Sequence, residues 1–215
     1  MEVPVEITWL GHACTRVRTR TAAVLLDPYQ RDGGLDMGRP TADIVTISHD
    51  DPRHNYVAGV RSQALVITGP GEYEVQGVQI LGVRTALRAA AEGVPGERAT
   101  AYVLEAEGLQ VAHLGASGRQ PTAEEAELLS NTDILILALG EDGLTPEEAA
   151  RTVRALEPGI TIPVGYAAEP GAWDAMLLAF RTAVGIEPEA AVTRLTVQAR
   201  AASEKQRIVL LEARG

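Results

Sequence analysis

The chain has 215 residues, of which 46% are hydrophobic and 22% are charged, and its formal net charge at pH 7 is −10. This composition is typical of a globular protein and excludes a disordered or fibrous chain, and the length suits one domain over residues 1–215. The negative charge repels phosphate groups, so neither nucleic acid nor an anionic membrane surface is expected as a partner.

The first half of the chain contains short apolar-rich runs that predict strands. Five such runs cover residues 5–10, 14–18, 22–26, 43–47 and 64–68, and the first three predict a meander. Residues 73–83 indicate either a long bent strand or a hairpin. Residues 101–105 and 109–114 flank Glu107-Gly108, a turn pair that predicts a hairpin.

In the second half, predicted helices alternate with strands. Thr122 opens one helix, and Thr145 precedes Pro146 as the N-cap of another, which extends to about residue 156. Residues 171–184 predict an amphipathic helix. The remaining predicted strands cover residues 133–139, 160–164, 192–198 and 206–212, the last two as a closing hairpin. This order favours two sheets packed face to face with helices outside, in one domain.

Cysteine usage and the N-terminal residues favour the cytoplasm. Cys14 is the only cysteine, so no intrachain disulfide can form. Residues 1–4 lack the basic and apolar regions of a secretion signal. No apolar run reaches the ~18 residues that a membrane span needs.

The segment Ser48-His49-Asp50-Asp51-Pro52-Arg53-His54-Asn55 is the most informative about function, because it directly follows a predicted strand. His49 and Asp51 are two residues apart, so an extended backbone directs both side chains to one side. Arg53 and His54 follow a proline and are placed to point at the same pocket. Two histidines at this spacing equally suit a loop in which they cap a helix or form ordinary hydrogen bonds.

The spacing of this segment resembles the His-x-His-x-Asp-His signature of the metallo-β-lactamase superfamily. Other segments resemble the UlaG-like branch of that superfamily in the same order, over roughly residues 5–170. They are Ile7-Thr8-Trp9-Leu10-Gly11-His12-Ala13, Leu26-Asp27-Pro28, Gly69-Pro70-Gly71-Glu72-Tyr73-Glu74-Val75, His113-Leu114-Gly115, residues 145–150 and Ile162-Pro163-Val164-Gly165-Tyr166. The resemblance implies a mixed α/β fold, the four-layer αββα sandwich.

The family's metal ligands are only partly present. In the signature, the first two histidines help to hold one zinc ion, and the aspartate and last histidine hold a second. His49 and His54 match, but Asp51 takes the place of the second histidine and Arg53 that of the aspartate.

Four further family positions have also changed. The bridging aspartate falls at Ala116, the last histidine ligand at Gly165, and a His-Asp pair at Leu87-Arg88. The second metal position therefore keeps only His54. Arg53 also adds a cation that would repel each unit of metal charge by ~4 kcal/mol at ~4 Å, so a second zinc ion is not expected.

The first metal position retains His49, Asp51 and His113, by the resemblance. Two histidines and a carboxylate can hold a catalytic zinc ion, which lowers the pKa of its bound water to ~7. Aspartate is shorter than histidine, however, and Asp51 has Arg53 and His54 as other partners. The alternative is a metal-free polar pocket in which Arg53 supplies the positive charge, so the chain would hold one zinc ion at most.

The resemblance also implies roles for residues around the pocket. His12 would lie near its mouth in a hydrogen-bonding role. Asp27 would orient the metal loop, or bond the backbone there without a metal. Glu72 would line the pocket or shape a turn.

Two hypotheses follow. The first is a binding or structural protein that keeps the fold but has lost the hydrolase activity. The second is a hydrolase with one metal at His49, Asp51 and His113, acting on a small ester, lactone or phosphodiester. Asp51 and Arg53 are the candidate catalytic residues. A small molecule or a protein is the expected partner, and a homo-oligomer is compatible with the sequence.

Overall fold

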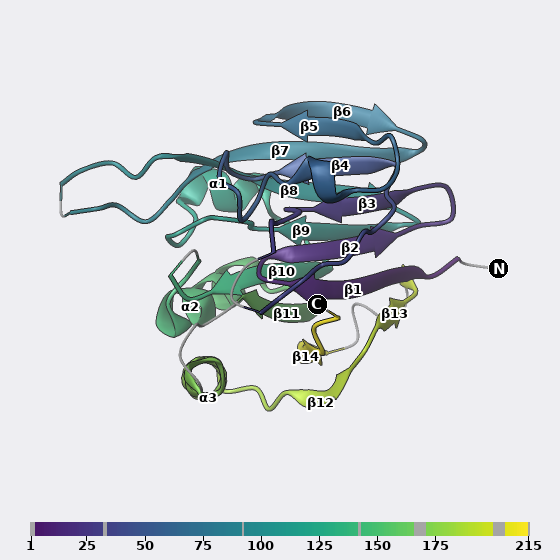
Figure 1. Ribbon diagram of the computed structural model, residues 1–215. Coiled ribbons are helices and arrows are strands. Elements are labelled where there is room, and N and C mark those ends of the chain that lie inside the picture. The colour runs from purple at the N-terminus through teal and green to yellow at the C-terminus, as the bar shows by residue number, and fades with distance from the viewer. Residues whose placement is uncertain are drawn as a thin grey trace.

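The computed structural model describes residues 3–31, 34–91, 93–141, 143–165, 171–199 and 205–214, which form a sandwich of two sheets (Figure 1). The six-stranded sheet has the order β13-β1-β2-β3-β4-β5. Its strands are β1 (Val5–Gly11), β2 (Cys14–Arg18), β3 (Ala23–Leu26), β4 (Ile44–Ile47), β5 (Leu65–Thr68) and β13 (Leu195–Val197).

The second sheet has eight strands in the order β12-β14-β11-β10-β9-β8-β7-β6. They are β6 (Gly71–Val75), β7 (Val78–Ala86), β8 (Arg98–Ala106), β9 (Leu109–His113), β10 (Ile134–Leu139), β11 (Ile160–Gly165), β12 (Glu189–Val192) and β14 (Arg207–Leu211). The described helices are α1 (Ala123–Leu128), α2 (Pro146–Leu156), α3 (Ala172–Val184) and the short 3₁₀ helix η1 (Val57–Gly59).

Strand β10 shows how the sequence separates the layers. All six of its residues are buried, as expected for a parallel strand covered on both faces. Ile134 and Ile136 contribute to the core between the sheets. Leu135 and Leu137 point the other way and pack in the core that holds α2 and Phe180 of α3.

The outer face of the six-stranded sheet is covered differently. Its core includes Leu25 and Val45 together with Tyr29, Met37 and Val60 from the covering segments. Apart from η1, those segments are loops in the described parts of residues 27–43 and 48–64, before and after β4. Positive φ angles of +89° at Gly34 and +68° at Gly38 prevent a regular helix there. The predicted sandwich is confirmed, with this layer irregular.

Most predicted turns and caps are present. Residues 73–83 belong to a hairpin of β6 and β7, and Glu107-Gly108 turns β8 into β9 with φ of +54° and +74°. Thr122 and Thr145 each form a capping box at the start of α1 and α2.

The predicted closing hairpin is wrong. β13 pairs with β1 in the six-stranded sheet, whereas β14 pairs with β11 and β12 in the other. Both segments have the apolar alternation of a strand, but alternation does not specify the pairing partner. No helix in the described ranges has the length and apolar character needed to cross a membrane.

Candidate functional site

The ends of parallel strands bring the site together. β3 and β4 are parallel, with Leu26 opposite Thr46. Asp27 and Ser48 follow these two strands, so both lie at the same edge of the sheet. β9 ends at His113 in the facing sheet, and the loop after it approaches the same edge.

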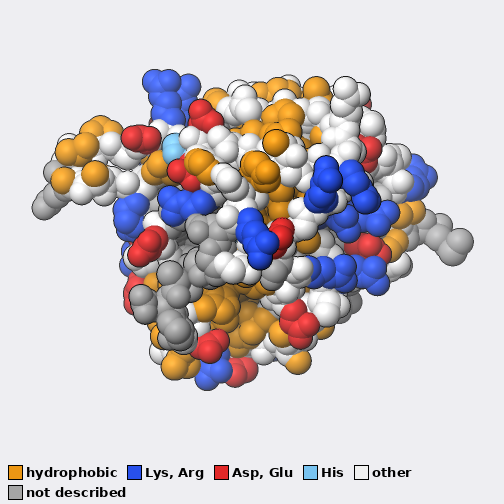
Figure 2. All heavy atoms as spheres, viewed as in Figure 1, with side chains coloured by type: hydrophobic (Ala, Val, Ile, Leu, Met, Phe, Trp, Pro, Cys, Tyr) orange, Lys and Arg blue, Asp and Glu red, His pale blue; other side chains and the backbone are white. Residues whose placement is uncertain are grey.

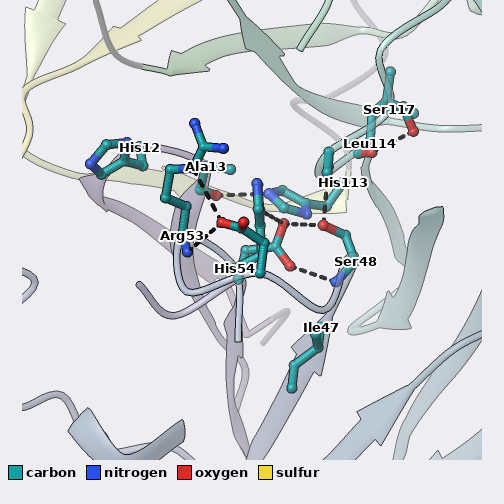
Figure 3. Close-up of polar contacts among 12 residues, drawn as sticks. His12, Ala13, Ile47, Ser48, Arg53, His54, His113, Leu114 and Ser117 are labelled. Atoms are coloured by element: carbon teal, nitrogen blue, oxygen red, sulfur yellow. Dashed lines mark hydrogen bonds and ion pairs between the residues drawn. The ribbon is translucent and has the colours of Figure 1, made fainter. Parts of the chain in front are cut away.

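Asp27 is the centre of a buried hydrogen-bond network, and its partners Ser48 and His54 are labelled in Figure 3. Its carboxylate accepts bonds from the Ser48 backbone N–H (2.7 Å) and the Ser48 hydroxyl (2.6 Å). The His54 Nδ1 lies 3.0 Å from Asp27 Oδ2 and donates to it, because a carboxylate only accepts. Asp27 is fully buried and has a positive φ of +50°, a geometry that these bonds stabilise.

Ser48 joins this network to the second sheet. Its hydroxyl oxygen accepts a bond from the Ala116 N–H (3.0 Å), and its carbonyl accepts one from the Thr100 N–H (2.9 Å). Gly115 allows the loop after β9 to lie this close to Ser48. A Cβ at position 115 would lie 2.3 Å from the Ser48 Cβ and 2.9 Å from Asp27 Oδ2. This role of Ser48 was not predicted, although its position after a strand parallel to that of Asp27 is a usable signal.

Burial and hydrogen bonding set the charges in the network. Burial alone would raise the pKa of Asp27, but His54, His113 and Ser48 together hold that pKa below its usual range. Burial lowers the pKa of His113, against the opposing attraction of Asp27. A neutral imidazole next to a carboxylate is therefore the favoured state of His113 at neutral pH.

His113 is oriented by the backbone of the first hairpin. Its Nε2–H donates to the Ala13 carbonyl at 2.9 Å, and the residue is only 1% exposed. The Nδ1 atom makes no hydrogen bond to any residue that the structure describes. One ring nitrogen is thus a donor engaged with the protein, and the other is a buried acceptor.

The loop after β4 contains the other candidate ligands. Asp51 Oδ1 accepts bonds from the Arg53 N–H (2.9 Å) and Nε–H (3.1 Å). Burial raises the pKa of Asp51, but these bonds and the Arg53 charge outweigh it and lower that pKa overall. The rings of His49 and His54 lie 6.5 Å apart between centroids.

A cavity of about 200 Å³ lies over this loop. It is lined by His49, Asp51, Arg53, His54, Leu87, Arg88, Ala116, Gly118 and Glu141. The first four were predicted to lie in a pocket, and Leu87, Arg88 and Ala116 were predicted to stand where the family has metal ligands or polar residues. Glu141 was not predicted, because it lies beyond β10 with no motif to mark it.

Two other predicted pocket residues lie outside this lining. His12 is 7% exposed, and its ring packs at 4.6 Å from that of Tyr29. Glu72 is exposed on β6. Tyr166, part of the last segment of the resemblance, is outside the described residues.

The described residues do not form a metal-binding set. No three or more of their His, Cys, Asp or Glu side chains are grouped so that they could hold one metal ion. A structural or catalytic zinc ion needs about three protein ligands, and the buried Nδ1 of His113 is a single one. The ligand roles predicted for His49, Asp51, His54 and His113 stay predictions.

Gly165, at the position of the family's last histidine ligand, has no room for a side chain. Its φ is +136°, and a Cβ there would lie 2.4 Å from the Leu139 carbonyl oxygen. Restoring a histidine would therefore require the ends of β10 and β11 to move apart.

Comparison with known proteins gives consistent matches. A family model described as a β-lactamase superfamily domain matches residues 6–165. A UPF0173 metal-dependent hydrolase of Methanopyrus kandleri is 25% identical over 197 residues, covering 77% of this chain and 86% of the relative. A UPF0173 protein of Pyrococcus furiosus is 25% identical over 180 residues, covering 75% of this chain and 83% of its own.

Among solved structures, a Thermotoga maritima protein aligns with a TM-score of 0.77 and 26% identity, over 98% of this chain and 100% of the other. It is described as a candidate Zn-dependent hydrolase of the metallo-β-lactamase superfamily.

Proposed function

The chain belongs to the β-lactamase superfamily, and on that premise we propose that it is a metal-free member that binds a ligand without the hydrolase activity. The observation that carries the proposal is the arrangement of donors: the described His, Cys, Asp and Glu residues form no group that could hold a metal ion. Without a metal to lower the pKa of water, the site lacks the metal-bound hydroxide that a metal-dependent hydrolase uses as its nucleophile.

The surroundings of Asp51 support this proposal. Asp51 Oδ1 accepts two bonds from Arg53, so a metal ion on this carboxylate would lie near the positive charge of Arg53. The bonds of His113 Nε2 to the Ala13 carbonyl and of His54 Nδ1 to the Asp27 carboxylate do not separate the candidates, because a metal-bound histidine makes the same kind of bond with its other nitrogen.

The hydrogen-bond network offers a replacement for the metal's structural role. Asp27, Ser48 and His54 join the ends of β3 and β4, and Ser48 reaches the loop after β9 through the Ala116 N–H. A metal ion that bridged these loops would hold the same segments together. The protein can therefore keep a shaped pocket with protein groups alone.

A mononuclear metal-dependent hydrolase that uses His49, Asp51 and His113 is the second candidate. It is favoured by the name of the M. kandleri relative, which is called a metal-dependent hydrolase, and by the unbonded Nδ1 of the buried His113 among the described residues. Its substrate would be a small ester, lactone or phosphodiester.

Metal analysis separates the two candidates. The purified protein is incubated with zinc, passed through a desalting column and analysed by mass spectrometry, alongside His113→Ala and His12→Ala. The proposal expects far less than one zinc ion per chain in all three proteins, and no rise in Tm with zinc. Stoichiometric zinc in the wild type and in His12→Ala, lost in His113→Ala, would establish the mononuclear site.

A further inference from the structure

Strand β5 forms an edge of the six-stranded sheet, because β4 is the only strand among the described residues that pairs with it. Figure 1 shows β5 along the top of the sandwich, next to β6 of the other sheet. The stretch around it, residues 62–71, contains no charged side chain. Charged residues or a short length normally protect an edge strand from pairing with another chain, so β5 is an open edge.

The other edge strands of the two described sheets are protected in these ways. β6 carries Glu72 and Glu74, and β12 carries Glu189, all of them exposed. β13 has only three residues and directly follows Arg194. The lack of protection is therefore particular to β5 among these edges.

Both faces of β5 are apolar at this edge. Leu65 is 51% exposed and Val66 is 40% exposed. Neighbouring residues of a strand point to opposite faces, so Leu65 shares a face with Ile67, which packs in the core between the sheets. Figure 2 shows hydrophobic and uncharged side chains along most of the top of the same view. Exposed apolar side chains on an edge strand are typical of a strand that another strand covers.

The unused backbone groups of β5 face outwards. The Leu65 N–H donates to the Asp43 carbonyl at 2.9 Å, so it faces β4. Because successive residues of a strand alternate, the N–H and C=O of Val66, the N–H of Thr68 and the C=O of Ala64 face away from β4. No hydrogen bond from these groups to a described residue is found. An added strand would satisfy them.

A second copy of β5 fits these groups in the antiparallel direction. With a two-fold axis at Val66, this residue lies opposite itself, and Ala64 lies opposite Thr68. Each outward N–H then meets an outward C=O of the other copy. Leu65 meets Ile67 on the inner face, and the two Val66 side chains meet on the outer face. The exposed apolar surface is thus covered on both faces.

The charges at the two ends of the uncharged stretch favour the same direction. Arg61 precedes the stretch and Glu72 follows it, and both are exposed. No ion pair of either with a described residue is found. In an antiparallel pair, the Arg61 end of one copy lies at the Glu72 end of the other. A parallel pair would bring like charges together, so charge complementarity selects the antiparallel pair.

We propose that the protein forms a homodimer by antiparallel pairing of β5 with β5 of a second copy, which joins the two six-stranded sheets into one. The pairing strand is short, so the interface lies below ~1,200 Å² and the dimer dissociates readily. The formal charge of −10 on each copy opposes association, but ~0.15 M salt screens this repulsion beyond ~8 Å. The inference goes beyond the proposed function and applies with or without a metal ion.

Sedimentation velocity at ~0.15 M salt measures the dimer directly. The average mass should rise from the 22.8 kDa of one chain towards twice that value as the concentration increases from about 5 to about 500 μM, a range chosen for a small interface. Val66→Lys should raise the dissociation constant at least about tenfold, because two like charges would face each other at the axis. The matched control is Val192→Lys on the edge strand β12, where the valine is 38% exposed, and it should associate like the wild type.

Cysteine cross-linking tests the register. Val66→Cys should form a disulfide-linked dimer on mild oxidation, because hydrogen-bonded residues opposite each other have Cα atoms about 5.5 Å apart, within the range of a disulfide. Thr68→Cys is the matched control, since its two cysteines would be offset by about four residues along the pair, on the order of 13 Å, and should not link. The native Cys14 is buried and does not compete.

Three results would overturn the inference: a monomer over the whole concentration range, equal dissociation constants for Val66→Lys and Val192→Lys, or equal cross-linking of Val66→Cys and Thr68→Cys. Circular dichroism identifies a lysine variant that does not fold, and the wild type and the two cysteine variants then decide. None of these results bears on the metal-free proposal, which zinc uptake tests separately.

Discussion

Replacing Asp27 by asparagine should be one of the most damaging conservative changes in this protein. The carboxylate is fully buried and accepts three hydrogen bonds, two from Ser48 and one from His54. An amide can keep the bond from the Ser48 N–H, but its NH₂ group then faces the other two donors. Ser48 could accept a bond from the amide as well as from the Ala116 N–H only by turning its hydroxyl hydrogen away from residue 27, which would leave that hydrogen without its present acceptor.

The expected loss of unfolding free energy is about 3–6 kcal/mol, because two bonds to a charged acceptor are lost and each contributes ~1.5–3 kcal/mol. With a urea m-value of ~2–3 kcal/mol/M, the midpoint should fall by at least about 1 M. Urea unfolding followed by circular dichroism measures this directly.

Asp43→Asn is the matched control. Asp43 lies just before β4, is exposed, and accepts a single bond, from the Ala23 N–H at 2.8 Å, which an asparagine oxygen can also accept. Its midpoint should change by less than about 0.3 M, since surface changes are usually within ~0.5 kcal/mol. If both variants lost the same stability, the reasoning about the buried network would be refuted.

Three further predictions concern the same framework. Gly115→Ala should lower the free energy of unfolding by more than about 2 kcal/mol, because its Cβ would meet Ser48 at 2.3 Å and its φ is +54°. Gly34→Ala is the control, with φ of +89° and nothing within 4 Å, and it should lower that free energy by only about 1–2 kcal/mol. Equal losses in urea unfolding would argue against the close approach of Gly115 to Ser48. The pKa of His113 is lowered in the folded protein, so its contribution to stability is complete above the ordinary histidine pKa of ~6.5 and is lost as pH falls towards the pKa of the folded state. The urea midpoint should therefore drop between about pH 7 and 5. An equally steep drop in a His113→Asn variant would exclude His113 as the cause. Thr145→Ala should remove the capping box of α2 at a cost of ~1 kcal/mol, measured as a lower Tm, and an unchanged Tm would show that the cap contributes nothing.

Local signals in the sequence predicted most of the fold. Caps such as Thr122 and turn pairs such as Glu107-Gly108 act within a few residues, so the sequence contains the whole interaction. The prediction of a closing hairpin failed because β13 and β14 pair with different strands, and no local pattern specifies which strand a segment pairs with. The same holds for the loop cover of the six-stranded sheet, whose apolar residues contact strands far away in sequence.

The candidate site was predictable in composition but not in connectivity. The resemblance placed Asp27, His49, Asp51, His54 and His113 at one end of the sandwich. The bonds of Ser48 depend on the pairing of β3 with β4 and on the approach of the loop after β9, which no spacing along the chain reveals. Arg88 was noted as a replacement for a family residue, but its bond to Glu148 spans 60 positions.

The separation of β13 and β14 between two sheets has a consequence for synthesis on the ribosome. β1, near the start of the chain, pairs with β13 on one side, and β11 pairs with β14. Until about residue 195 and then residue 207 have been made, β1 and β11 therefore each lack the neighbour that pairs with one side of them in the finished sheet. Unpaired strands invite pairing with other nascent chains, so these later segments also protect the earlier ones.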